Sequence, residues 1–168
     1  MINWMYFPKN HKADNVSVQI VRVFENAASK IDSAVHNHNS NTVLSFVRAD
    51  LENAGFVVEK GKRAEDKIHI PVLYGMNGQA QLAFEADAYH FGSKYVIEVE
   101  AGRAVTNYQF LKDFFEACMM SDSEYLCIAV RNTYRKHKDF EFLCNFFDVL
   151  FLSNRVAIPL KGILVIGY

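Results

Sequence analysis

Acidic side chains recur at every second position on two neighbouring stretches of the sequence. Glu85 and Asp87 lie on the first stretch, Glu98 and Glu100 on the second, and Gly92-Ser93 stands between them. Because strand side chains alternate between faces, a two-residue hairpin turn at Gly92-Ser93 places all four carboxylates on one face. Asp87 then lies opposite Glu98, and Glu85 opposite Glu100. Opposed like charges destabilise a strand pair, so we expect a cation among them, and oxygen ligands without His or Cys favour Mg²⁺ or Mn²⁺.

A solvated acidic face on an exposed hairpin is the alternative interpretation, because surface strands also alternate polar and apolar residues. The opposite face of the hairpin is apolar and would pack into a core in both cases. Its residues are Leu82, Phe84, Ala86, Ala88, Tyr95, Ile97 and Val99. The order of the surrounding elements is therefore what distinguishes a site from a surface.

Helical and extended patterns flank the acidic hairpin. Asp14 or Asn15 can cap a first helix, and Gly55 is a typical end for the second. The Asn-rich loop at 36–41 is typical of turn chemistry, with a metal site at its two histidines as the alternative. Helices are expected at 16–34, 42–54, 104–120 and 140–152, and strands at 56–59, 68–74, 84–91, 94–100, 124–130 and 162–168.

Composition indicates one folded domain. The 168 residues are 51% hydrophobic, which is enough for a substantial core, and the formal net charge is −1. A nucleic-acid partner would therefore have to bind a local basic patch. The three scattered cysteines are typical of a reduced, cytoplasmic protein, and we expect neither a signal peptide nor a membrane span.

The order of elements from residue 42, with Asp87 on the second core strand and Glu98-Val99-Glu100 on the third, resembles the PD-(D/E)XK nuclease superfamily. The resemblance implies a single restriction-endonuclease-like domain over 1–168, with an α/β (α+β) mixed sheet. Its core, at 42–130, would be a helix, three antiparallel strands, a helix and a strand. A helical extension would precede it at 1–40, and a helix and strand would follow at 131–168.

The resemblance also implies an activity, the metal-dependent hydrolysis of DNA phosphodiester bonds. Asp87 and Glu98 would hold Mg²⁺ (or Mn²⁺), and Glu100 would orient or deprotonate the attacking water. The motif usually has Lys at the third position, so Glu100 is a departure that leaves the water-activating group open. Two further alternatives are a repair or junction-resolving nuclease, and a non-catalytic nucleic-acid-binding or oligomerisation module on the same fold.

Two more residues are candidates for the catalytic site. Glu52 occupies the place from which the family often supplies an acidic residue on its first core helix, although an ordinary surface Glu would look the same. Arg103 lies on a backward extension of the inward stripe of the helix expected at 104–120. It could contact the scissile phosphate or form a structural ion pair with Glu100.

One dense basic segment could contact DNA phosphates. It contains Arg131, Arg135, Lys136 and Lys138, and the alternative is a solvated loop. The helix expected at 140–152 is apolar nearly all round, so it must be buried within the fold or against a second subunit. A homodimer would place two sites on the two strands of DNA.

Overall fold

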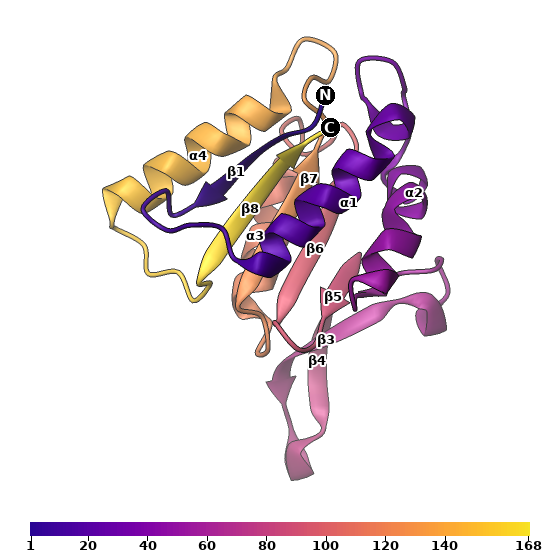
Figure 1. Ribbon diagram of the computed structural model, residues 1–168. Coiled ribbons are helices and arrows are strands. Elements are labelled where there is room, and N and C mark those ends of the chain that lie inside the picture. Colours follow the sequence, from indigo (N-terminus) through magenta and orange to yellow (C-terminus); the bar gives the residue numbers. More distant parts are fainter.

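The computed structural model describes residues 1–168 and has a mixed α/β fold (Figure 1). A six-stranded mixed sheet has the strand order β1-β8-β7-β6-β5-β2, and β3 and β4 form a separate two-stranded sheet. The elements are β1 (Asn3–Phe7), α1 (Asn15–Ile31), α2 (Ser40–Asn53), β2 (Val57–Val58), β3 (Ile68–Tyr74), β4 (Ala80–Ala86), β5 (Ala88–His90), β6 (Tyr95–Glu100), α3 (Gln109–Met119), β7 (Tyr125–Val130), α4 (Asp139–Ser153) and β8 (Gly162–Gly167), with short 3₁₀ turns at Ala64–Asp66 and Met76–Gly78.

Three parallel strands, β6, β7 and β8, form the centre of the sheet. Both faces of these strands are covered, which explains their nearly continuous apolar sequences. Helices α1 and α2 pack on the face that presents Ile97 and Val99, and α3 and α4 pack on the face that presents Val96. The alternation of β6 therefore directs Glu98, two residues after Val96, toward the side of α3.

The N-terminal residues differ from the helical extension predicted at 1–40. Asn3–Phe7 forms β1, which pairs antiparallel with β8 at the edge of the sheet, and only then does α1 begin. The five-residue strand has little pattern of its own, since Trp4 is exposed while Tyr6 and Phe7 are buried. Its partner lies about 160 residues away in sequence, so local periodicity could not reveal it.

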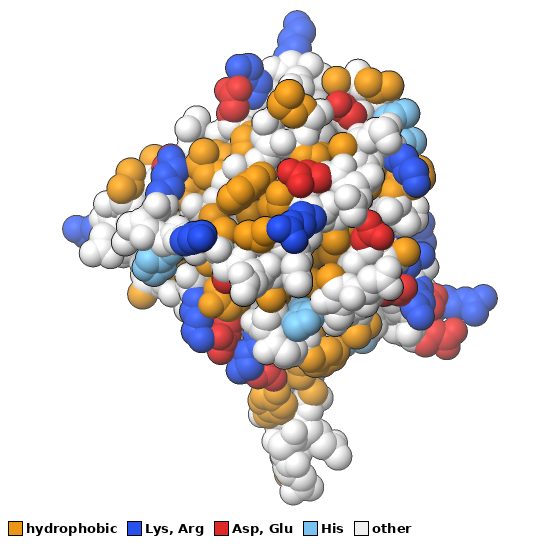
Figure 2. All heavy atoms as spheres, viewed as in Figure 1, with side chains coloured by type: hydrophobic (Ala, Val, Ile, Leu, Met, Phe, Trp, Pro, Cys, Tyr) orange, Lys and Arg blue, Asp and Glu red, His pale blue; other side chains and the backbone are white.

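The strand predicted at 84–91 is broken at Asp87. Ala86 ends β4, which pairs with β3 in an arm that extends from the sheet, and Ala88 begins β5. The predicted register between β5 and β6 is confirmed, with Tyr89 opposite Val96. The last pair is His90 with Tyr95, so four residues rather than two form the connecting loop. The tip of the arm carries no charged side chain (Figure 2).

Capping residues mark the starts of α1 and α2, whereas α3 begins later than predicted. Asp14 caps α1 by accepting a hydrogen bond from the Ser17 amide at 2.9 Å, and Asn39 caps α2 through the Thr42 amide at the same distance. The second helix ends before Gly55, whose φ of 93° favours glycine. By contrast, α3 begins at Gln109 rather than at 104, because residues 101–108 form a loop.

The apolar helix α4 is buried on one side only. Leu143 and Phe147 are fully buried against the sheet, whereas Phe142, Val149 and Leu152 are exposed by 40%, 67% and 82%. Phe147 packs against the rings of Phe7, Phe110, Phe114 and Phe146. Burial within the fold therefore accounts for one face of α4, and the other face is exposed and could contact a second subunit.

Replacing Phe147 tests this packing. Phe147→Ala should lower the free energy of unfolding by about 3–5 kcal/mol, because it leaves a cavity among four aromatic rings. Val149→Ala on the exposed face of the same helix should change it by less than about 0.5 kcal/mol. Urea unfolding followed by circular dichroism measures both, and equal effects would contradict the packing described for α4.

Candidate active site

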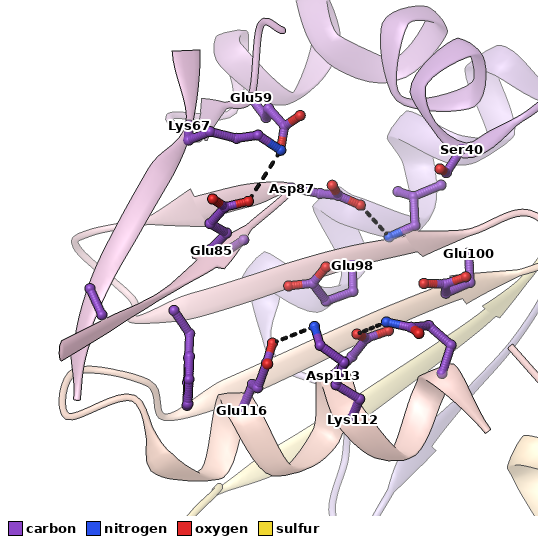
Figure 3. A pocket seen from close by; sticks show the side chains of 15 residues that line it. Ser40, Glu59, Lys67, Glu85, Asp87, Glu98, Glu100, Lys112, Asp113 and Glu116 are labelled. Atoms are coloured by element: carbon purple, nitrogen blue, oxygen red, sulfur yellow. Dashed lines mark hydrogen bonds and ion pairs between the residues drawn. The ribbon is translucent and has the colours of Figure 1, made fainter. Parts of the chain in front are cut away.

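A polar pocket of about 340 Å³ lies between β6, α3 and the base of the arm (Figure 3). Carboxylates dominate its lining, with seven of them against two lysines. The acidic residues are Glu59, Glu85, Asp87, Glu98, Glu100, Asp113 and Glu116, and the lysines are Lys67 and Lys112. Such an excess of one charge in a recess of the fold is unusual for a structural surface, because like charges repel and burial removes the water that screens them.

Glu98 and Glu100 owe their position to the alternation of β6. Ile97 and Val99, which precede and separate them, are buried on the opposite face of the sheet under α1 and α2. The two glutamates therefore point to the side of α3, as Figure 3 shows. The prediction that they share one face is confirmed.

Asp87 lies at the junction between the arm and the large sheet. Its side-chain Oδ2 accepts a hydrogen bond from the Val99 amide at 2.8 Å, and its backbone carbonyl accepts one from the Glu59 amide at 2.8 Å. Where the strand breaks, the Asp87 carboxylate therefore accepts the hydrogen bond of the Val99 amide that a backbone carbonyl would accept in a continuous strand. This contact fixes Asp87 across from Glu98 and directs both into the pocket.

Asp113 of α3 adds a fourth carboxylate that the sequence analysis missed. It is only 5% exposed, and Gln109 donates a hydrogen bond to its Oδ1 at 3.2 Å. Oδ2 is buried, and its nearest possible donor is the protonated carboxyl group of Glu100, a contact that raises the pKa of Glu100 and lowers that of Asp113. A signal was present in the sequence, since Asp113 interrupts an inward apolar stripe between Phe110 and Phe114. A polar residue within such a stripe indicates a partner on the facing element.

Burial raises the pKa of all four carboxyl groups. Desolvation is the largest cause in each case, and it raises the pKa of Asp87 to about 7, of Glu100 to about 8 and of Asp113 to about 6. Desolvation and then the charge of Asp87 raise the pKa of Glu98 well above its ordinary value. Without a cation, the site therefore retains protons near neutral pH.

The two lysines lie on opposite sides of the carboxylates. Lys67 pairs with Glu59 at 2.9 Å and with Glu85 at 3.2 Å, and these contacts hold the arm against the segment after β2. Lys112 pairs with Glu116 at 2.9 Å, and its charge lowers the pKa of Glu98, Glu100 and Asp113. Positive charge thus comes from α3, whereas position 100 of β6 carries a carboxylate.

Two predicted acidic residues lie elsewhere than expected. Glu85 does not pair with Glu100, because it belongs to the arm, opposite His69, and binds Lys67 at the rim of the pocket. Glu52 is exposed on α2 and does not line the pocket. Glu59, from the segment after β2, is the acidic residue that this part of the chain contributes instead.

Arg103 also differs from its predicted position. It lies in the loop between β6 and α3, two residues after Ala101, and is exposed. It forms no ion pair with Glu100, which removes the structural alternative for this residue. Instead it lines a second pocket that adjoins the first at Glu100.

Only part of the basic segment at 131–138 is exposed at the surface. Arg131 is 6% exposed and donates hydrogen bonds to Asn37 Oδ1 at 2.8 Å and to the His38 carbonyl, so the alternative of a solvated loop does not hold for this residue. Arg135, Lys136 and Lys138 are exposed. Lys138 also pairs with Glu141 at 2.9 Å, which leaves Arg135 and Lys136 as the exposed cations of the segment that form no ion pair.

The donor set of the acidic pocket fits a hard divalent cation. Carboxylate oxygens are the ligands that Mg²⁺ and Mn²⁺ prefer, and the buried Oδ2 of Asp113 has only the protonated Glu100 as a possible donor, so a cation could replace that proton. The side chains as they stand do not converge tightly, since no three His, Cys, Asp or Glu side chains form a group that could hold a metal ion. The fit therefore rests on chemistry and burial.

Comparison of the chain with protein-family models and with curated proteins gave no match. None of the helices combines the length and the apolar character needed to cross a bilayer.

The raised pKa values predict how stability depends on pH in EDTA. A carboxyl group whose pKa is near 4 when unfolded and about 7 when folded, as for Asp87, favours folding below pH 4 and loses this contribution as the pH rises to 8. The loss for Asp87 is on the order of 2–4 kcal/mol. Asp87→Asn, which retains an acceptor for the Val99 amide, should reduce this pH dependence.

Urea unfolding at pH 5 and pH 8 measures the effect, with Glu52→Gln as the exposed control. Wild-type protein and the control should both be less stable at pH 8, and Asp87→Asn should lose less. An Asp87→Asn variant with the full wild-type pH dependence would contradict the burial assigned to this carboxyl group.

Proposed function

We propose that this chain is a metal-dependent nuclease that hydrolyses DNA phosphodiester bonds and has a restriction-endonuclease-like core. The observation that carries the proposal is the gathering of four carboxylates around one pocket, in which Asp113 is buried and Asp87, Glu98 and Glu100 are half-buried. Placing like charges together away from water costs free energy, and a bound cation would offset that cost.

The arrangement of the elements supports the core. Helix α2 is followed by the antiparallel pair β5 and β6, then by α3 and the parallel strand β7. Asp87 precedes β5, and Glu98-Val99-Glu100 ends β6, which is the order that the PD-(D/E)XK motif requires. The arm of β3 and β4 is inserted before β5 and stays outside the main sheet.

Asp87 and Glu98 are the proposed ligands of Mg²⁺ (or Mn²⁺), and Asp113 is a further carboxylate within the same recess. The bound ion would neutralise charge on the phosphate and make a water molecule nucleophilic. Glu100, whose pKa of about 8 lies near neutrality, can accept a proton from the attacking water once its own proton has left. Lys112 supplies positive charge beside Glu98 that the usual lysine of the motif would supply from position 100.

A second candidate is a non-catalytic nucleic-acid-binding or oligomerisation module on the same fold. Two observations favour it, namely Glu100 at the position of the usual lysine and the lack of a converged metal-binding group. The exposed apolar face of α4 would serve a homodimer under either candidate. The unpaired cysteines fit the proposed cytoplasmic location.

The nuclease proposal predicts a specific loss of activity. Purified protein should cleave supercoiled plasmid or short DNA duplexes with Mg²⁺ or Mn²⁺, and EDTA should stop cleavage. Asp87→Asn should reduce the rate by at least about 100-fold, because it removes a ligand charge while it keeps the hydrogen bond to Val99. Glu52→Gln, outside the pocket, should cleave at the wild-type rate.

Three outcomes separate the candidates. Cleavage by wild type that Asp87→Asn abolishes supports the nuclease. Cleavage that survives Asp87→Asn at the wild-type rate excludes this pocket as the catalytic site. DNA binding without any cleavage, with either metal, favours the non-catalytic module.

A further inference from the structure

A second pocket, of about 540 Å³, adjoins the acidic one and has the opposite chemistry. The two pockets share Ser40, Glu100 and Gln109 in their linings. The second pocket is also lined by Arg103 and Arg131, and Glu100 is the only acidic residue that lines it. A cation-binding recess and a basic recess therefore lie side by side at the end of β6.

Arg131 is a buried cation that contacts no carboxylate, although its charge lowers the pKa of the buried Asp139 carboxyl group. Arg131 is the first residue after β7. Its side chain is 6% exposed, and its guanidinium lies 5.0 Å from the centre of the Tyr134 ring. Its two hydrogen bonds, to Asn37 Oδ1 and the His38 carbonyl, use two of the five N–H donors of a guanidinium. No ion pair includes it. Buried charges are normally paired, so an anion in the pocket would complete its contacts.

Two helices begin at this pocket. Ser40 and Gln109, which line it, are the first residues of α2 and α3. Asn39 caps only the Thr42 amide of α2. No side chain caps α3, but its Phe110 and Leu111 amides donate to the carbonyls of Ala104 and Tyr108, so the Gln109 amide is the one that can reach an anion. The amides of a first helical turn and the helix dipole both favour an anion, so the two helix N-termini add to the charge of the arginines.

The loop after β6 positions Arg103 at the second pocket. Gly102 has a φ of 99°, and a Cβ there would lie 2.5 Å from the Tyr134 ring, so only glycine lets the loop pack against that ring. Arg103 follows directly, is exposed and has no ion-pair partner. The same ring thus contacts the loop that carries Arg103 and the guanidinium of Arg131.

We propose that this second pocket is a phosphate-binding site. Arg131, Arg103 and the first turns of α2 and α3 would hold a phosphate group next to the carboxylates of the acidic pocket. The inference rests on the proposed nuclease function and deepens it, because it assigns the residues that bind the substrate's phosphate backbone. A phosphodiester in DNA and a free phosphate compound share the required chemistry, and the experiment distinguishes them.

The test is a set of ¹H–¹⁵N NMR titrations of the full chain in EDTA, in which no cleavage can occur. The probes are inorganic phosphate, adenosine 5′-monophosphate and a 12-base-pair DNA duplex. The amides of Ser40 and Gln109 and the Nε–H of Arg131 should shift saturably with the duplex and with the smaller probes. Arg103→Ala should weaken binding about 10-fold, as expected for one charge-assisted hydrogen bond. Arg155→Ala, an exposed arginine at the far end of α4, should not.

The outcomes separate this inference from the nuclease proposal. Shifts at these three groups that weaken in Arg103→Ala support the phosphate site. Shifts elsewhere, no shifts, or equal binding by Arg103→Ala and wild type overturn it, even if the protein cleaves DNA with Mg²⁺. Shifts with the two small probes but not with the duplex support a phosphate site whose ligand is a free phosphate compound, and they count against the proposed nuclease function.

Discussion

Mutual repulsion among carboxylates that are buried or half-buried in one pocket is the constraint on which the rest of this structure depends. Asp87, Glu98, Glu100 and Asp113 reach one pocket from a strand junction, a central strand and a helix, and burial raises the pKa of each. The surrounding fold must therefore hold them together against their own charge. The parallel strands β6, β7 and β8, which are apolar on both faces apart from Glu98 and Glu100, supply that rigidity, and Lys67 and Lys112 reduce the repulsion at the rim.

The break at Asp87 connects this constraint to the topology. A continuous strand would have extended β5 into the arm and paired it along the whole of β6. Instead the chain leaves the large sheet, and the Asp87 carboxylate accepts the hydrogen bond of the Val99 amide. The arm can then extend from the sheet while Lys67 joins it to Glu59. One side chain thus ends a strand, completes a hydrogen bond and takes part in the proposed site, which is why Asp87→Asn is a better probe than a truncation to Ala.

Local pattern in the sequence predicted much of this arrangement and could not predict the rest. Alternation placed Glu98 and Glu100 on one face, and the register of Tyr89 with Val96 followed from the turn. Pairing of β1 with β8 depends on residues at opposite ends of the chain, so no local signal revealed it. Arg103 was misplaced because a helical stripe was extended through a loop that Gly102 allows. Asp113 interrupts the apolar stripe of α3, which indicated a polar partner, but that its partners are the carboxylates of β6 appears only in the folded structure.

The measurement that tests the central claim most directly is isothermal titration calorimetry of Mn²⁺ in buffers of different ionisation enthalpy at pH 7. If the buried carboxyl groups hold protons until a cation replaces them, binding should release about one proton or more per ion. Both affinity and proton release should fall in Asp87→Asn. Binding that releases no proton, or that is unchanged in Asp87→Asn, would contradict a cation site formed by these carboxylates.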